Sequence, residues 1–273
     1  MSGRDDIFMV ANYAIVTMVA FRMNYFAPMD KEIHDKSACF DSIVQTRRAV
    51  RKFHPTDYDP EAVTRSLARA HLAPSSSNMQ LWEFYRVSSP DKMKLLSRFC
   101  MGQNTTETAR EMIVVVARPD LWRRRAQSNY NFVKENLGDR PAFKGRSALS
   151  YYGKLMPMLY NNDMFGIRGA IKRIVAWFIG LRRPMVRQVS GNDMRIVAHK
   201  SAALAAQTFM LSMVAEGHDT CPVEGFDSKR VKRLLNLPRR AEINMVITCG
   251  KRIPEGIYGP RFRIPLEEVV FEV

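Results

Sequence analysis

The sequence contains few cysteines and no spacing that would bind a metal. Its four cysteines are scattered along 273 residues without a C-x-x-C pair, and a chain of this length does not need disulfide bonds to compensate for a small core. Its five histidines lack the H-x-x-x-H and H-E-x-x-H spacings that place two ligands on one face of a helix. We therefore expect a protein of a reducing compartment that holds no metal.

Two nucleotide-binding motifs are also missing. No G-x-G-x-x-G follows a strand pattern and no G-x-x-x-x-G-K-[ST] occurs, which argues against a Rossmann dinucleotide site and a P-loop. Zinc-finger spacing and an RNP-type aromatic box are absent as well, so nucleic-acid binding would rest on charge alone, and we expect no nucleic-acid partner. Acidic residues are scarce: 27 Asp and Glu stand against 42 Lys and Arg, a formal net charge of +15, which favours anionic partners.

No apolar run is long enough to cross a bilayer comfortably. Residues 7–21 carry no charge, but a membrane span needs about 20 apolar residues, and the acidic pair that follows Arg4 is unlike a signal peptide. We expect residues 1–40 to be a helical N-terminal extension. Three interpretations remain open: a helix packed on the body or on a partner, an interfacial anchor, or an upstream extension of a chain whose functional start is Met29.

Periodicity predicts the elements of a single domain over residues 41–273. Helices are expected at residues 42–50, from Pro60 after an Asp59 cap, at residues 90–100, and at residues 196–216 before Gly217. Strands are expected at residues 82–88, 112–117, 243–249 and 266–273, and the continuous apolar run at 112–117 is typical of a central strand covered on both faces. The stretch of residues 119–195 is long, basic and weakly patterned.

Two polar motifs bracket the helix that begins at Pro60. The first, "RRAVRKF", places Arg47, Arg48 and Arg51 within five residues, and a guanidinium is a rigid fork of donors suited to phosphate. The second, "APSSSN" at residues 73–78, offers hydroxyls and backbone N–H groups to a polar ligand. Taken singly, each has an ordinary explanation as a helix end or a solvated loop.

Together these motifs resemble the FMN-dependent nitroreductase family. Its opening signature, "RRSxRxF" followed by "APSSxNxQPWxF", is similar to "RRAVRKF" and "APSSSNMQLWEF" here. Its later "cPIeGFd" is similar to "CPVEGFD" at residues 221–227, and its basic pair before "LP" to Arg261 and Arg263 before "IP". The sequence departs from the family at Ala49, where a serine is common, and at Leu81, where a proline is common. The resemblance covers residues 41–273.

The resemblance implies an α+β (α/β sandwich) fold in an intertwined homodimer. A central, mostly antiparallel sheet would be flanked by helices, with a helical lid over the flavin at about residues 119–195, the helix at 196–216 in the dimer interface and the C-terminal tail reaching across the dimer. A lysine of the family is Glu107 here, so the charge near the flavin ring would rest mainly on Arg51.

The resemblance also implies a site. The phosphate would be held by Arg47, Arg261 and Arg263, the pyrimidine ring would meet Arg51 and Asn104, and the backbone N–H groups of Glu224 and Gly225 would face flavin N5 and O4. No side chain need be catalytic. The implied FMN-binding set is Arg47, Arg48, Ala49, Arg51, Pro74, Ser75, Ser76, Asn78, Asn104, Pro222, Val223, Glu224, Gly225, Arg261 and Arg263.

The activity implied is transfer of hydride from NAD(P)H through FMN to nitroaromatics, quinones or similar small acceptors by a ping-pong mechanism, in the cytoplasm. One alternative is a relative with another flavin chemistry, such as reductive dehalogenation or flavin destruction. Another is a non-enzymatic basic protein, bound to membrane surfaces or nucleic acid, that uses the same scaffold.

Residues 167–183 are predicted to form a basic amphipathic helix. Six apolar residues recur at helical spacing, and four basic residues occupy other faces. Such a stripe more often packs on the body of a protein, with the charges in water, but a basic amphipathic helix can also lie on an anionic membrane. Peripheral membrane contact through residues 167–183 or 7–27 therefore stays open.

Overall fold

The computed structural model describes residues 31–136, 147–163 and 165–273. The chain forms two compact units, Met1–Thr46 and Arg47–Val273. In the first unit the described part is helix α2 (Lys31–Thr46); the apolar stretch at 7–27 lies outside the described residues, and the expected boundary after residue 40 stays a prediction. The helix predicted at residues 42–50 is wrong at its end, because Ala49 forms a parallel bridge with Thr220.

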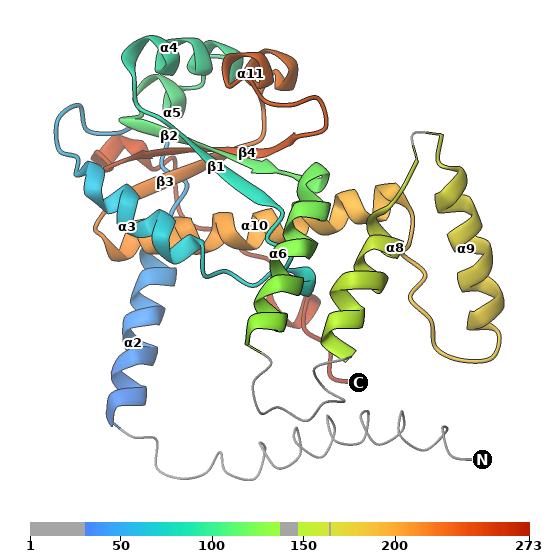
Figure 1. Cartoon of the computed structure of the whole chain (residues 1–273). Helices are drawn as coiled ribbons and strands as arrows, with labels where there is room; N and C mark the ends of the chain where they lie inside the picture. Colours follow the sequence, from blue (N-terminus) through green and yellow to red (C-terminus); the bar gives the residue numbers. More distant parts are fainter. Residues whose placement is uncertain (1–30, 137–146, 164) are drawn as a thin grey trace. The chain divides into compact units, whose positions relative to one another are not determined.

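The second unit is built on a four-stranded antiparallel sheet. Its strands are β1 (Trp82–Val87), β2 (Glu111–Ala117), β3 (Asp219–Val223) and β4 (Glu242–Gly250), in the order β1-β2-β4-β3 (Figure 1). Every residue of β2 is buried, which confirms the central strand that the uninterrupted apolar run predicts.

Helices cover both faces of this sheet. On one face, α3 (Pro60–Ala70) and α10 (Gly191–Ala215) share a core with Ile113 and Val115. On the other, α4 (Pro90–Phe99) and α11 (Ser228–Leu234) pack against Met112, Val114 and Val116. Alternate residues of β2 thus enter opposite cores, as the two-residue period of a strand requires. Figure 1 shows α4 and α11 on one side of the strands and α3 and α10 on the other.

Capping residues set where two of these helices begin. Asp59 accepts a hydrogen bond from the Glu61 backbone N–H at 2.9 Å, which confirms the predicted start of α3. Helix α10 begins at Gly191, earlier than predicted, because Ser190 and Asp193 form a capping box. It ends before Gly217, whose φ of 71° lies in the left-handed region.

The excursion between β2 and α10 is helical. It contains η2 (Pro119–Leu121), α6 (Trp122–Glu135), the π-helical turn η3 (Tyr151–Leu155), α8 (Met156–Tyr160) and α9 (Ile167–Gly180). The strand predicted at residues 266–273 is wrong: the tail contains only the short turn η5 (Leu266–Glu268), and all of residues 259–273 are exposed. Strand composition alone does not make a strand when no neighbouring strand pairs with it.

The four cysteines are free thiols. Cys100, Cys221 and Cys249 are buried, and Cys39 on α2 is exposed. Burial raises the pKa of Cys100 to about 12 and also raises the pKa values of Cys221 and Cys249. Among the helices that the structure describes, none has the length and apolar character needed to cross a bilayer.

Candidate functional site, an arginine-lined cavity

The arginine segment is held against the edge of the sheet by backbone pairing. The Val50 N–H donates to the Thr220 carbonyl at 3.2 Å, and the Arg51 N–H donates to the Gly256 carbonyl at 2.7 Å. The Thr105 hydroxyl donates to the Val50 carbonyl at 3.0 Å. These bonds join residues 47–51 to β3 and to the segment after β4, so that two motifs distant in the sequence become neighbours.

The two segments enclose a cavity of about 270 Å³. The Arg261 guanidinium donates to the Arg47 carbonyl at 2.5 Å, and the Arg48 guanidinium donates to the Gly259 carbonyl at 2.5 Å. Gly259 has φ of 130°, which side-chain-bearing residues rarely adopt, so this wall favours glycine. The lining residues are Arg47, Arg48, Ala49, Arg51, Ile257, Tyr258, Gly259, Pro260, Arg261, Phe262 and Arg263.

The cavity is strongly electropositive. Five of its lining residues are arginines and none is acidic. Burial lowers the pKa of Arg47, and the positive charges of Arg261 and Arg263 lower it further. A phosphate monoester would offset the repulsion among these cations, since its oxygens accept several guanidinium hydrogen bonds and its charge compensates the cluster. The donor set therefore fits a phosphate-bearing ligand.

Asn104 lies next to this cavity. Its side-chain amide donates to the Tyr258 hydroxyl at 2.9 Å, and Tyr258 is one of the lining residues. The adjacent Gln103 donates to the Gly225 carbonyl at 3.2 Å and to the Cys100 carbonyl at 3.0 Å. The short helix α5 (Asn104–Glu107) therefore connects the arginine cavity with the turn after β3.

The turn after β3 carries the other predicted contacts. Pro222 and Val223 are paired with β4, opposite Ile247 and Val246. Glu224 and Gly225 follow on the exposed turn, and the Gly225 Cα faces the Gln103 amide so closely that an added Cβ would lie 3.3 Å from its nitrogen. A small residue at this position keeps the backbone accessible.

The serine loop is organised separately. The Ser75 hydroxyl accepts from the Gln80 N–H at 3.0 Å, and the Ser76 N–H donates to the Ser201 hydroxyl of α10 at 3.3 Å. Asn78 donates to Asn129 of α6 at 2.9 Å, while Pro74 is exposed. These residues are not among those lining the arginine cavity, so within one chain the structure brings the three arginines together but does not bring the serine loop to them.

Sequence reasoning missed Tyr258, Gly259 and Gln103. Tyr258 and Gly259 directly precede the basic pair in "IYGPRFR", and an aromatic residue beside a glycine in a basic segment could have marked a cavity wall. Gln103 carried no comparable signal, because its role depends on the approach of the turn at Gly225.

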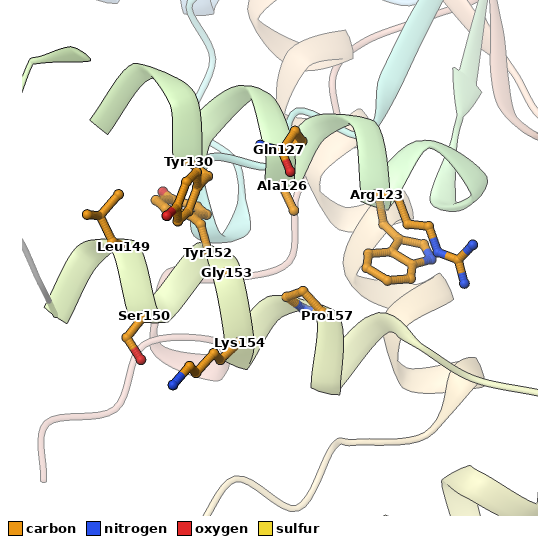
Figure 2. Close-up of a pocket in the computed structure, with 11 residues that line it drawn as sticks. Arg123, Ala126, Gln127, Tyr130, Leu149, Ser150, Tyr152, Gly153, Lys154 and Pro157 are labelled. Atoms are coloured by element: carbon orange, nitrogen blue, oxygen red, sulfur yellow. The ribbon is translucent and has the colours of Figure 1, made fainter. Parts of the chain in front are cut away.

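A second, larger cavity of about 740 Å³ lies within the excursion, between α6 and the helix around η3 (Figure 2). Figure 2 shows Tyr130 of α6 beside Tyr152 and Gly153 of η3. The Tyr152 hydroxyl donates to the Ser77 carbonyl at 3.2 Å, so one wall of this cavity is tied to the serine loop. In the described ranges, no group of three or more His, Cys, Asp or Glu residues could hold a metal ion.

Known proteins share both the sequence pattern and the architecture. The chain matches the model of the Nitroreductase family over residues 44–251. MhqN of Bacillus subtilis (strain 168), assigned provisionally to the NAD(P)H nitroreductases, is 26% identical over 234 residues, 85% of this chain and 97% of MhqN. The 4-nitrobenzoate reductase of Pseudomonas putida is 26% identical over 215 residues, 77% of this chain and 82% of that enzyme.

The fold is likewise shared with a solved structure. A nitroreductase family protein from Streptococcus pneumoniae TIGR4 gives a TM-score of 0.62 at 20% identity, covering 86% of this chain and 100% of that chain. This likeness, together with the antiparallel sheet flanked by helices, confirms the predicted α+β class.

Proposed function

Because this chain belongs to the nitroreductase family, we propose that it is an oxidoreductase that binds FMN, accepts hydride from NAD(P)H and reduces nitroaromatics, quinones or similar small acceptors. The names of MhqN and of the 4-nitrobenzoate reductase support a nicotinamide donor and a nitroaromatic acceptor. FMN, when bound, supplies the hydride-transfer chemistry.

The observation that carries this proposal is the arginine cavity. Five arginines and no acidic residue line it, and Arg47, Arg261 and Arg263 lie close enough for the two later charges to lower the pKa of the first. A terminal phosphate, which FMN has and FAD lacks, would meet all three guanidiniums. Their role is to bind and anchor the cofactor.

The remaining predicted residues would orient the flavin ring and polarise its reactive end. From the family resemblance we assign Arg51 and Asn104 to the pyrimidine end of the ring system. Asn104 lies beside the cavity, since its amide donates to the Tyr258 hydroxyl. The backbone N–H groups of Glu224 and Gly225 would face flavin N5 and O4, on the turn that Gln103 fixes. Backbone donors suffice for this task, so the Glu224 carboxylate has no assigned proton transfer.

We also propose a homodimer. Phe262, Leu266 and Phe271 in the tail expose 77%, 69% and 73% of their surface, and Ile196 and Leu204 on α10 are also exposed. Exposed apolar residues gathered on a tail and on a central helix are typical of an interface. In the dimer the serine loop of one protomer can reach the cofactor held in the cavity of its partner, which would unite the two predicted sets of ligands.

The first experiment is a visible spectrum of the purified protein. We expect a yellow protein with the absorption bands of a flavin, and heat release followed by chromatography should yield FMN rather than FAD. A colourless protein that also fails to bind added FMN would overturn the proposal. A yellow protein that does not reduce acceptors with NAD(P)H would favour one of the alternatives. These are flavin destruction, reductive dehalogenation and a non-enzymatic scaffold.

The second experiment tests the phosphate contact. Arg263→Ala should weaken FMN binding by about tenfold to hundredfold, because a hydrogen bond to a charged group contributes roughly 1.5–3 kcal/mol. Flavin fluorescence titration measures this change, and the exposed Arg98→Ala on α4 is the matched control. Equal affinity in the two variants would remove Arg263 from the site.

We propose that the reaction follows a ping-pong mechanism. The sequence holds neither a Rossmann nor a P-loop motif for a separate nucleotide site, so NAD(P)H and the acceptor would use one cavity in turn. Steady-state rates at varied donor and acceptor concentrations should give parallel double-reciprocal lines. Intersecting lines would show a ternary complex instead.

For location we propose the cytoplasm. The support is that all four cysteines are free thiols, which suits a reducing compartment. Labelling of cell fractions with an antibody would test it, and recovery from the periplasm or from culture medium would contradict it.

A further inference from the structure

Helix α9 presents its bulky apolar residues outward. Six large apolar residues of α9, together with Leu181 just after the helix, each expose between 49% and 63% of their surface. They recur at a helical period, so that they form one continuous face. The residues of this face are Ile167, Ile171, Ile174, Val175, Trp177, Phe178 and Leu181.

The opposite side of α9 holds the helix to the body of the protein. Gly169 and Ala176 are its buried residues, and a Cβ added at Gly169 would lie 3.5 Å from the Ser190 Cα. Lys172 donates from Nζ to the Leu159 carbonyl at 2.9 Å and to the Asn162 side chain at 3.0 Å. Burial lowers the pKa of this lysine. The stripe expected to pack on the body therefore faces away from it, and a charged residue faces inward.

The charged residues in the stretch of chain that carries the apolar face are all cationic. Residues 165–189 contain no Asp or Glu, and the basic residues in this stretch other than Lys172 are exposed: Arg168, Arg173, Arg182, Arg183 and Arg187. The nearest preceding acid, Asp163, accepts from the Ile167 and Arg168 N–H groups at 3.0 Å and 2.7 Å, so its charge is engaged at the start of the helix.

We propose that the outward face of α9 docks into the surface of an anionic phospholipid membrane. A helix of this length measures about 21 Å, so it would lie in the interface plane with its apolar side chains below the headgroups and its arginines at the phosphates. Trp177, with its amphipathic ring, suits the same depth. A second copy of this chain is the less favourable occupant, because each copy carries a formal charge of +15 and brings the same arginines.

The docking surface is independent of the proposed cofactor chemistry. None of its residues lines the arginine cavity, so membrane binding and flavin binding can fail separately. Docking would give the enzyme a position at the membrane, where apolar acceptors concentrate.

Sedimentation with vesicles tests the proposal on the full-length protein. We expect binding to vesicles of phosphatidylcholine with phosphatidylglycerol, little binding to phosphatidylcholine alone, and weaker binding when the salt concentration rises from about 0.02 M to about 0.5 M, because salt screens the arginines. Ile174→Asp combined with Phe178→Asp should lower the partition coefficient roughly 100-fold or more. The control, Leu72→Asp with Phe132→Asp, alters two other exposed apolar residues outside α9.

Charge variants test the electrostatic part. Arg182→Gln with Arg183→Gln should lower the partition coefficient about 30-fold, since each cation near an anionic surface contributes roughly a fivefold change. Lys92→Gln with Lys94→Gln on α4 removes the same net charge from exposed positions and should change binding little. Equal losses in the two pairs would show attraction by net charge alone and would contradict docking by α9.

Three further outcomes would overturn the proposal. Membrane binding that survives in the double aspartate variant would place the contact in another segment, such as residues 7–27. Equal binding to neutral and anionic vesicles would remove the role of charge. A lower molecular mass of the aspartate variant in light scattering would identify the face as an interface between copies. Circular dichroism that matches the unaltered protein shows that the variant is folded, so each outcome is interpretable.

Discussion

Helices α9 and α10 follow each other in the chain and have opposite surroundings. In α10, ten residues are buried, and four of them are alanines against the sheet. In α9, only a glycine and an alanine are buried, while the isoleucines, valine, phenylalanine and tryptophan are exposed or partly exposed. The four alanines let α10 approach the sheet closely, and they lie beside large buried residues such as Phe209. Apolar periodicity alone therefore does not tell which way a helix faces, because α9 and α10 are both rich in apolar residues and only α10 buries the large ones.

The strongest test of this contrast exchanges the same residue type in both helices. Phe209→Ala in α10 should lower the free energy of unfolding by about 3–5 kcal/mol, because it removes a fully buried ring and leaves a cavity. Phe178→Ala in α9 should change it by about 0.5 kcal/mol or less, since that ring is exposed. Urea unfolding measures both. A loss of similar size in both variants would mean that α9 packs within the chain.

A smaller effect on stability is expected at the contact that attaches α9 to the body of the protein. Lys172→Met removes hydrogen bonds to the Leu159 and Asn161 carbonyls and to Asn162, which should cost about 1–3 kcal/mol of local stability. Hydrogen exchange should then speed up in residues 167–180 and stay unchanged in α10. Arg173→Met alters the neighbouring exposed cation and serves as the control. Faster exchange in both helices would show that they open as one unit.

The smallest effect concerns the capping box that separates the two helices. The Ser190 hydroxyl and backbone N–H hold the pKa of Asp193 below its usual range. A lowered folded-state pKa stabilises the protein above the unfolded pKa of about 3.9, and this contribution disappears as the pH falls through the folded pKa. Ser190→Ala should therefore cost about 1 kcal/mol at neutral pH.

Asp193→Asn should remove part of the acid sensitivity. Urea midpoints near neutral pH and near about pH 3 should differ less in this variant than in the unaltered protein. Asp91→Asn, in the first turn of α4, where the cap makes no side-chain hydrogen bond, provides the comparison. An identical response of the two variants would remove Asp193 from the pH dependence.

Local chemistry predicted the body of the fold well. The Asp59 cap and the apolar run of β2 are signals that act within a few residues, and both are confirmed. The tail and the orientation of α9 could not be predicted in this way. Whether a strand-like tail pairs, or which way a stripe faces, depends on neighbours that are remote in the sequence or belong to another molecule.

The candidate site, too, could be predicted only in part from the sequence. Resemblance to a family suggested the three arginines, and the structure places them on one cavity, although their role as FMN ligands stays a prediction. The separation of the serine loop from that cavity was not predicted. Its position follows from hydrogen bonds to Ser201 and Asn129, which no short motif encodes. Sequence patterns indicated which residues are polar and accessible, but the partner of each depends on the tertiary structure.

The burial of three thiols has a practical consequence for spectroscopy. Cys100, Cys221 and Cys249 are inaccessible and have raised pKa values, so at neutral pH they hold almost none of the thiolate that reacts with maleimides. Cys39 on α2 is exposed. A thiol-directed fluorophore or spin label should therefore attach at one position in the unaltered protein, and would report on the movement of α2 without any substitution.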